Sequence, residues 1–235
     1  MLTRDVRWPG MSALVVFDLD GTLVDSREDL AASTNDVLVS LGAQPLAIDQ
    51  VCRMVGDGAR TLVQRALVAA GCEADLDLAL AAFHRSYAGR LLETTRPYPG
   101  VDDVLATLRA DVQLAVLTNK PLTPTLRLID HFGWRGIFGR VIGGDGPFPR
   151  KPDPSGLLDL MAWAGARPED TLMVGDSMVD VEVARHAGVA VCVAAYGFGA
   201  ARGDLTLRGD ELLAHTAAEI SDTWSRGPGV QESGT

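Results

Sequence analysis

Two aspartates, Asp18 and Asp20, follow directly after a short apolar run and are themselves followed by Gly21 and Thr22. Aspartate and glycine are ordinary turn residues, so this stretch taken alone is equally consistent with a plain turn at the end of a strand. Polar residues also follow three later apolar runs. They are Thr118, Asn119 and Lys120 after the second run, Lys151 after the third, and Asp176, Ser177 and Asp180 after the fourth. The repeated arrangement indicates one shared site rather than unrelated turns.

A shared site with so many carboxylates needs positive charge, because like charges at short range repel each other. Oxygen ligands with no nearby cysteine or histidine favour a hard cation, Mg²⁺ above all. Such an ion leaves room for a phosphate oxygen, Lys151 adds a second positive charge, and Thr118 and Asn119 can donate hydrogen bonds. This set combines positioning with charge neutralisation, which phosphoryl transfer requires. A nucleotide-binding Walker loop is excluded, because neither Lys120 nor Lys151 is preceded by glycine.

The apolar runs predict the strands that must position these residues. Continuous apolar runs are typical of strands that are covered on both faces, and stretches with helical periodicity separate them. The runs cover residues 13–17, 112–117, 140–144, 171–175 and 189–195. Their alternation with helices predicts an α/β fold with a doubly wound, Rossmann-like parallel sheet. Ligands bind outside the carboxyl ends of the strands in such sheets, which is where the polar residues lie.

The alternation stops between the first and second runs, where residues 26–92 show helical periodicity without a strand-like run. We therefore predict that an all-helical cap domain is inserted into the sheet domain. Ser26 and Asp29 have the spacing of a capping box at the start of its first helix. The predicted division is a cap at residues 25–94 and an α/β core at residues 11–24 and 95–225.

The composition and net charge of the chain limit the kinds of molecule that it is expected to bind. The formal net charge of −10 and the lack of a lysine- or arginine-rich run argue against nucleic acid and anionic membranes, and no apolar stretch is long enough to cross a bilayer. The cysteines form no CxxC pair, so neither a zinc site nor a disulfide framework is indicated, and a cytoplasmic location is expected. The chain is expected to be a monomer or a homodimer. The ends, residues 1–10 and 226–235, are predicted to be disordered.

Four short motifs carry a resemblance to a known family. In chain order, "DLDGT", "LTNK", "KPDP" and "GDSMVD" resemble the motifs of the haloacid-dehalogenase superfamily of phosphatases, and the helical insertion resembles its cap. The resemblance covers residues 13 to about 213. It implies that Asp18 is the nucleophile that takes the phosphoryl group and that Asp20 is the general acid and base. The presence of Asp20 favours phosphate esters over carbon–halogen bonds, since the dehalogenating members lack an aspartate there.

The same resemblance implies roles for the other motif residues. Thr118 and Lys151 match the phosphate binders, and Asn119 matches the neighbour that helps to hold the nucleophile or the substrate. These roles describe a Mg²⁺-dependent phosphatase that works through an aspartyl phosphate. The implied Mg²⁺ ligands are Asp18, Asp20 through its backbone carbonyl, Asp176, and Asp180 in or just behind the metal shell.

Three longer stretches, "VGDGARTLVQRAL", "TRPYPGV" and "VIGGDGPFPRKPDP", resemble the bacterial phosphoglycolate phosphatases. This makes 2-phosphoglycolate, a small anionic phosphate ester, the expected substrate. The glycines of the first stretch allow close backbone approach, and Arg60 is a candidate cation for the substrate carboxylate. Those enzymes more often carry asparagine where this chain has Asp57, and a carboxylate there is unhelpful unless it points away from the substrate. The candidate substrate-binding residues are Thr22, Gly56, Gly58 and Arg60.

Other activities share these motifs. A phosphatase of a sugar or amino-sugar phosphate, an inorganic pyrophosphatase and a phosphomutase are the alternatives within the superfamily. A regulatory binding module that merely uses the fold is disfavoured, because Asp18, Asp20, Lys151 and Asp176 are all kept. A hydrolysis screen over small phosphate esters separates these possibilities.

Overall fold

The computed structural model describes residues 13–203 and 205–226. The predicted start of the core at residue 11 lies outside these ranges, and so does the predicted disorder at the two ends. Of the ends predicted to be disordered, residue 226 alone is described, as the last residue of a helix. No helix within the described ranges is long and apolar enough to cross a membrane.

The main sheet has six parallel strands in the order β5-β4-β1-β6-β7-β8. Every strand that the apolar runs predict is present, which confirms the α/β sheet. Strand β8 was not predicted; it lies at the sheet edge, and its middle residue, Leu213, is exposed. The strands are β1 Leu14–Phe17, β4 Gln113–Leu117, β5 Arg140–Ile142, β6 Thr171–Gly175, β7 Ala190–Ala194 and β8 Leu212–Ala214.

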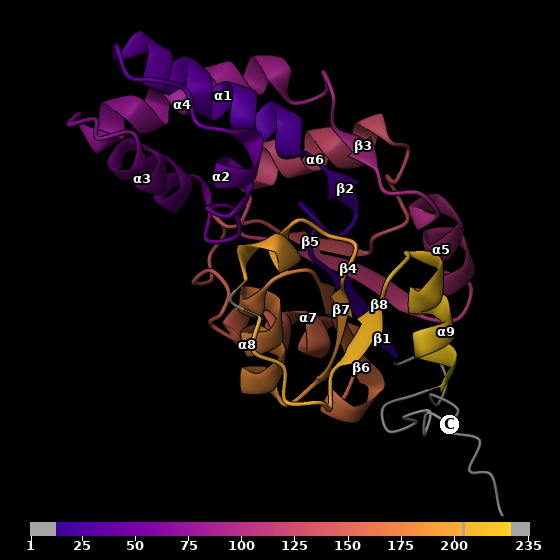
Figure 1. Cartoon of the computed structure of the whole chain (residues 1–235). Helices are drawn as coiled ribbons and strands as arrows, with labels where there is room; N and C mark the ends of the chain where they lie inside the picture. The colour runs from indigo at the N-terminus through magenta and orange to yellow at the C-terminus, as the bar shows by residue number, and fades with distance from the viewer. Residues whose placement is uncertain (1–12, 204, 227–235) are drawn as a thin grey trace, which may run out of the picture.

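Helices cover both faces of this sheet, as a doubly wound fold requires (Figure 1). Successive side chains of β1 point to opposite faces. Val15 and Phe17 pack with α5, α6 and α9, whereas Leu14 and Val16 pack with α7 and α8. The core helices are α5 Val101–Leu108, α6 Leu122–His131, α7 Ser155–Ala164, α8 Met178–Ala187 and α9 Ala218–Arg226, with short 3₁₀ turns at Pro168–Asp170 and Gly199–Arg202.

The helical cap forms a second body beside the sheet domain, drawn in indigo and purple in Figure 1. It contains α1 Arg27–Ser40, α2 Ile48–Cys52, α3 Ala59–Ala69 and α4 Leu76–Arg90. The chain enters and leaves it through a two-stranded antiparallel ribbon of β2 (Val24–Asp25) and β3 (Arg96–Pro97). This ribbon was not predicted, because two residues per strand leave no pattern in the sequence. The exact domain boundaries at residues 25 and 94 stay predictions.

The strand order places a crevice at the carboxyl end of β1. Strand β1 lies between β4 and β6, and the chain leaves β4 toward β5 on one side and β6 toward β7 on the other. Ligands bind at such a reversal of strand order in open α/β sheets. The cap follows β1 directly along the chain, so the helical insertion begins next to this crevice.

Candidate active site

The end of β1 brings Asp18 to the crevice. Asp18 is the first residue after the strand, and its N–H donates to the carbonyl of Val174 on β6 at 2.8 Å. A tight turn follows, in which Gly21 has a φ of +89°. A Cβ atom at Gly21 would lie 1.9 Å from Asp176 Oδ2, so only glycine allows the first motif to pack against the fourth.

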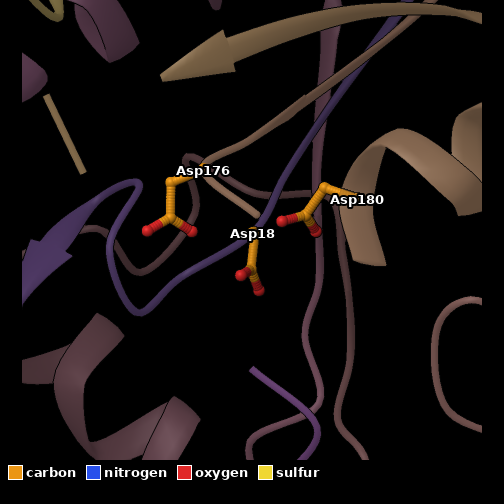
Figure 2. A group of neighbouring side chains, drawn as sticks. All are labelled: Asp18, Asp176 and Asp180. Carbon is orange, nitrogen blue, oxygen red and sulfur yellow. The ribbon is translucent and has the colours of Figure 1, made fainter. Parts of the chain in front are cut away.

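Three buried carboxylates converge at this point, those of Asp18, Asp176 and Asp180 (Figure 2). Each offers one oxygen, and these oxygens lie within 4.8 Å of one another. Burial raises the pKa of Asp18 to about 6, while Lys151 opposes and Asp180 adds to this effect. Burial, with the nearby Asp180 and Asp18 charges, also raises the pKa of Asp176 well above its ordinary value. A bound cation would offset this electrostatic cost, and the all-oxygen donor set fits a hard divalent ion.

Lys151 supplies a positive charge inside the same cluster. Its Nζ lies 2.9 Å from Asp18 Oδ1 and 2.6 Å from Asp180 Oδ1, and its side chain is 2% exposed. Burial alone would lower the pKa of Lys151, but the two carboxylates hold it above its usual value. Asp180 Oδ2 accepts hydrogen bonds from the Ser177 N–H at 3.1 Å and from its hydroxyl at 2.7 Å. Both Asp180 oxygens are therefore occupied in orienting Lys151 and Ser177.

Asn119 joins three segments through its side-chain amide. Its Oδ1 accepts from the Lys151 N–H at 2.9 Å, and its Nδ2 donates to the carbonyls of Lys151 at 3.0 Å and Gly56 at 2.9 Å. The first two bonds fix the backbone that carries Lys151, and the third reaches the cap. Thr118, one residue earlier, is buried and lies at the cavity wall. The structure thus brings both residues to the site that the sequence predicted for them.

Asp20 lies beside the carboxylate cluster and has two partners. The Ser26 hydroxyl donates to Asp20 Oδ1 at 2.7 Å, and Lys120 Nζ lies 3.0 Å from Oδ1 and 2.9 Å from Oδ2. The Lys120 side chain is 4% exposed, and its Nζ also contacts the Tyr87 hydroxyl of cap helix α4 at 2.5 Å. Sequence reasoning gave Lys120 no role, because its position after Asn119 does not reveal either partner.

A cavity of about 60 Å³ opens between the core and the cap. Its core wall includes Asp18, Asp20, Thr118, Asn119, Lys120 and Asp176. Its cap wall includes Gly56, Gly58, Leu62, Phe83, His84 and Tyr87. The predicted cap glycines therefore lie at the cavity, opposite the catalytic motifs. The core wall is mostly polar and charged, whereas the cap wall is largely glycine, leucine and aromatic.

Two predicted substrate-binding residues are not brought to this cavity. Thr22 is fully buried and is not part of the cavity wall; its carbonyl accepts a hydrogen bond from the Tyr196 hydroxyl at 2.8 Å. Arg60 pairs with Asp77 at 2.6 Å on the outer surface of the cap, where the two side chains are 49% and 79% exposed. Helical periodicity placed Arg60 on α3 but could not decide which side of the helix meets the core. The geometry therefore gives no support to either residue as a substrate contact.

Asp57 points away from the cavity, although it stands between the two cap glycines. Its Oδ2 lies 2.5 Å from Arg65 Nη1 and 3.4 Å from Arg202 Nη2, and Arg202 Nη1 donates to the Val55 carbonyl at 2.7 Å. Gly56 has a φ of +122°, and a Cβ atom there would lie 2.6 Å from Arg202 Nη1. The aspartate at position 57 thus adds an ion pair between cap and core rather than a charge in the cavity.

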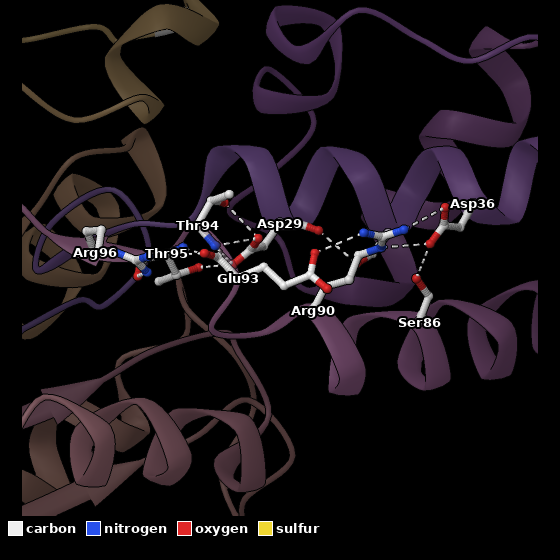
Figure 3. A network of polar contacts seen from close by, with 9 residues as sticks. Asp29, Asp36, Ser86, Arg90, Glu93, Thr94, Thr95 and Arg96 are labelled. Atoms are coloured by element: carbon white, nitrogen blue, oxygen red, sulfur yellow. Dashed lines mark hydrogen bonds and ion pairs between the residues drawn. The ribbon is translucent and has the colours of Figure 1, made fainter.

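Asp29 of α1 links the two chain segments that cross between core and cap (Figure 3). These crossings are residues 25–29, where the chain enters the cap, and residues 93–96, where it leaves. The Asp29 carboxylate accepts hydrogen bonds from the backbone N–H groups and the hydroxyls of Thr94 and Thr95, at 2.7–3.2 Å. The predicted capping box was wrong, because Ser26 makes no side-chain cap and its hydroxyl bonds Asp20 instead. Both side chains bind residues outside the helix instead, and the Ser26 bond links the start of the cap to the turn that carries Asp20.

Comparison with known proteins places this arrangement in context. The family model described as "Haloacid dehalogenase-like hydrolase" matches residues 15–194, which include every motif residue described above. A phosphoglycolate phosphatase of Pseudomonas putida is 43% identical over 202 residues, covering 83% of this chain and 74% of the relative. A phosphoglycolate phosphatase of Chromobacterium violaceum is 38% identical over 218 residues, covering 91% of this chain and 96% of the relative.

Solved structures agree with the fold. The crystal structure of a predicted phosphoglycolate phosphatase from Haemophilus somnus superposes with a TM-score of 0.81 at 31% identity. The match covers 89% of this chain and 96% of that one, so it includes both the sheet domain and the inserted helices. The likeness therefore extends over the core, the cap and the crevice between them.

Proposed function

Because the chain belongs to the haloacid dehalogenase-like hydrolase family, we propose that it is a Mg²⁺-dependent phosphatase that hydrolyses 2-phosphoglycolate to glycolate and phosphate. The observation that carries the proposal is the buried cluster of Asp18, Asp176 and Lys151 beside Asp20, at the carboxyl edge of the parallel sheet. The substrate follows from relatives named phosphoglycolate phosphatase at about 40% identity over most of the chain.

The proposed reaction has two displacement steps at phosphorus. In the first, an Asp18 oxygen forms a bond to phosphorus while the bond to the ester oxygen breaks, and Asp20 gives that oxygen a proton. In the second, Asp20 takes a proton from water, the water oxygen attacks phosphorus, and Asp18 leaves as a carboxylate. Lys151, at 2.9 Å from Asp18, neutralises the phosphate charge in both steps.

The metal site is assigned to residues whose geometry suits it. Asp18 and Asp176, with the Asp20 backbone carbonyl, would hold Mg²⁺, and Asp180 stands behind them because its oxygens already bind Lys151 and Ser177. When bound, the ion would offset the charge of the buried carboxylates and polarise the phosphate group. The raised pKa of Asp18, about 6, supports a need for such a cation, since the nucleophile must be ionised.

The test is phosphate release by the purified full chain with Mg²⁺. The panel contains 2-phosphoglycolate, ethyl phosphate, an aryl phosphate, hexose and amino-sugar phosphates, and pyrophosphate. We expect the highest kcat/KM on 2-phosphoglycolate, with glycolate and inorganic phosphate as the products. A higher kcat/KM on another member of the panel would mean that this compound, and not 2-phosphoglycolate, is the preferred substrate. An isomerised phosphate ester without free phosphate would indicate a phosphomutase.

A further inference from the structure

The cation that binds the substrate carboxylate has to come from the cavity itself. A phosphorylated acid carries a phosphate and a carboxylate, and Lys151 pairs with Asp18 and Asp180 at the phosphate end. Among the residues described at the cavity wall, the basic side chains are Lys120 and His84. Arg60 lies outside this wall and pairs with Asp77. The choice therefore lies between a lysine of the core wall and a histidine of the cap wall.

The position of Lys120 relative to Asp20 fits the shape of the substrate. Lys120 Nζ lies 2.9 Å and 3.0 Å from the two Asp20 oxygens. Asp20 is the group that protonates the departing ester oxygen in the proposed reaction. In 2-phosphoglycolate a single carbon separates that oxygen from the carboxylate carbon. A group that contacts Asp20 is therefore within reach of the carboxylate once the phosphate is bound at Asp18.

A cap residue holds the other side of the Lys120 ammonium group. The Tyr87 hydroxyl lies 2.5 Å from Nζ, and Nζ lies 4.5 Å from the centre of the Tyr87 ring. Tyr87 is buried and stacks on Phe83, with ring centroids 5.5 Å apart and planes 17° apart. An ammonium group has several donors, so it can keep its Tyr87 contact while it exchanges one Asp20 oxygen for a substrate oxygen.

His84 is the weaker candidate. Its side chain is exposed as a whole. Partial desolvation of its ring nevertheless lowers its pKa below the ordinary value, and the Asp145 charge opposes this effect. At neutral pH it therefore offers a hydrogen bond rather than a charge. Lys120, in contrast, places a permanent positive charge on the core wall. A charge-assisted hydrogen bond to a carboxylate is stronger than a neutral one.

We propose that Lys120 binds the carboxylate of the substrate and that Tyr87, from the cap, positions it. This inference rests on the proposed function, and it makes Lys120 the residue that separates phosphorylated acids from phosphate esters without a carboxylate. It also gives the cap a part in recognition through a single contact with the core wall.

The experiment compares kcat/KM for 2-phosphoglycolate and for ethyl phosphate, a phosphate ester of similar size that lacks the carboxylate, in wild type and Lys120→Met. We expect the variant to lose roughly 10- to 100-fold more on 2-phosphoglycolate than on ethyl phosphate, the loss typical of one charge-assisted hydrogen bond. Lys120→Arg should restore part of the preference because it keeps the charge. Circular dichroism confirms that each variant is folded.

Tyr87→Phe keeps the stacked ring and removes the hydroxyl. As a positioning residue, it should raise the KM for 2-phosphoglycolate severalfold with little change in kcat, and should leave ethyl phosphate nearly unaffected. Arg60→Ala, at the exposed pair with Asp77, is the matched control and should keep the wild-type preference.

The outcomes separate the two proposals. Equal losses on both esters in Lys120→Met would mean that Lys120 acts only through Asp20, and no loss would remove it from the site; either result overturns the inference. If the wild type prefers 2-phosphoglycolate and Lys120→Met keeps that preference, the inference fails while the proposed function stands. If the wild type itself shows no preference for the acid, the proposed substrate fails and the carboxylate role of Lys120 fails with it.

Discussion

The core wall and the cap wall of the cavity are held in place by different forces. Asp18 of the core wall pairs with Lys151, which is not itself part of the wall and which pairs in turn with Asp180. All three side chains are buried, so each charge depends on the others. On the cap wall, the backbone carbonyls of Gly56 and Val55 accept hydrogen bonds from Asn119 and Arg202 of the core. The chemistry thus belongs to a fixed charge network, whereas the cap side depends on a few separable contacts.

The difference predicts how each wall responds to substitution. Removing one partner of a buried ion pair leaves an uncompensated charge and typically costs about 3–5 kcal/mol. Breaking a partly exposed pair such as Asp57–Arg202 costs about 0–1 kcal/mol. Changes to the Asp18–Lys151–Asp180 network should therefore have the largest effects, whereas changes to the cap side should adjust substrate affinity or stability.

The largest effect is expected at the nucleophile. Asp18→Asn keeps the size of the side chain but removes the attacking carboxylate, so turnover should fall by roughly 10⁴-fold or more, and no acid-stable phosphoprotein should form. Phosphate release and acid-quench labelling measure the two effects, and circular dichroism confirms that the variant is folded. Wild-type turnover in a cleanly purified variant would remove Asp18 from the mechanism.

Metal removal tests the core wall as a unit. Excess chelator should stop catalysis, Mg²⁺ should restore it, and Ca²⁺ should not, because Ca²⁺ prefers more ligands at longer distances. Asp176→Asn should raise the Mg²⁺ concentration for half-maximal activity steeply, since it removes one oxygen charge from the cluster. Full activity in excess chelator would mean that the carboxylate cluster needs no metal.

A smaller effect is expected at the crossings between core and cap. Asp29→Asn should lower the free energy of unfolding by about 1.5–3 kcal/mol, because it replaces a carboxylate that accepts several hydrogen bonds. Asp36→Asn, on the same helix but exposed and paired with Arg90, is the matched control and should cost less. Denaturant unfolding measures both free energies. Equal losses would mean that the Asp29 hydrogen bonds stabilise the fold no more than an exposed ion pair does.

The Asp29 contribution should also depend on pH. Burial acts to raise the pKa of Asp29, but hydrogen bonds from Thr95 and Thr94 leave it below its ordinary value. A depressed folded-state pKa stabilises the fold above the unfolded-state pKa, near 4, and this contribution is lost as the pH falls through the folded-state pKa. The stability difference between wild type and Asp29→Asn should therefore shrink below about pH 4.

The smallest effect is expected at the cap turn. Asp57→Asn weakens the pairs with Arg65 and Arg202, so we expect the KM for 2-phosphoglycolate to rise about two- to fivefold with little change in kcat. Asp77→Asn, which breaks an exposed pair on the same domain, should leave both constants unchanged. A fall in kcat without a change in KM would show that the Asp57 pair supports the chemical step instead.

Much of the catalytic arrangement could be predicted from the order of residues alone. Asp18, Thr118 and Asp176 each directly follow an apolar run, Lys151 follows one after a loop, and the carboxyl ends of parallel strands meet at one edge of a sheet. Once the runs are recognised as strands, these side chains must gather there. The family motifs added their chemical roles, and the inserted helices were visible as a break in the alternation.

The tertiary structure decided the partners of side chains whose segments are far apart in the sequence. Ser26 and Asp29 have the spacing of a capping box, yet the Ser26 hydroxyl bonds Asp20, only six residues away, and Asp29 binds Thr94 and Thr95, which only the fold brings close. Lys120 meets Tyr87 and Asp57 meets Arg202 for the same reason. Local spacing fixes where a residue lies on its own helix or strand, but the packing of the cap against the core determines which charge it faces.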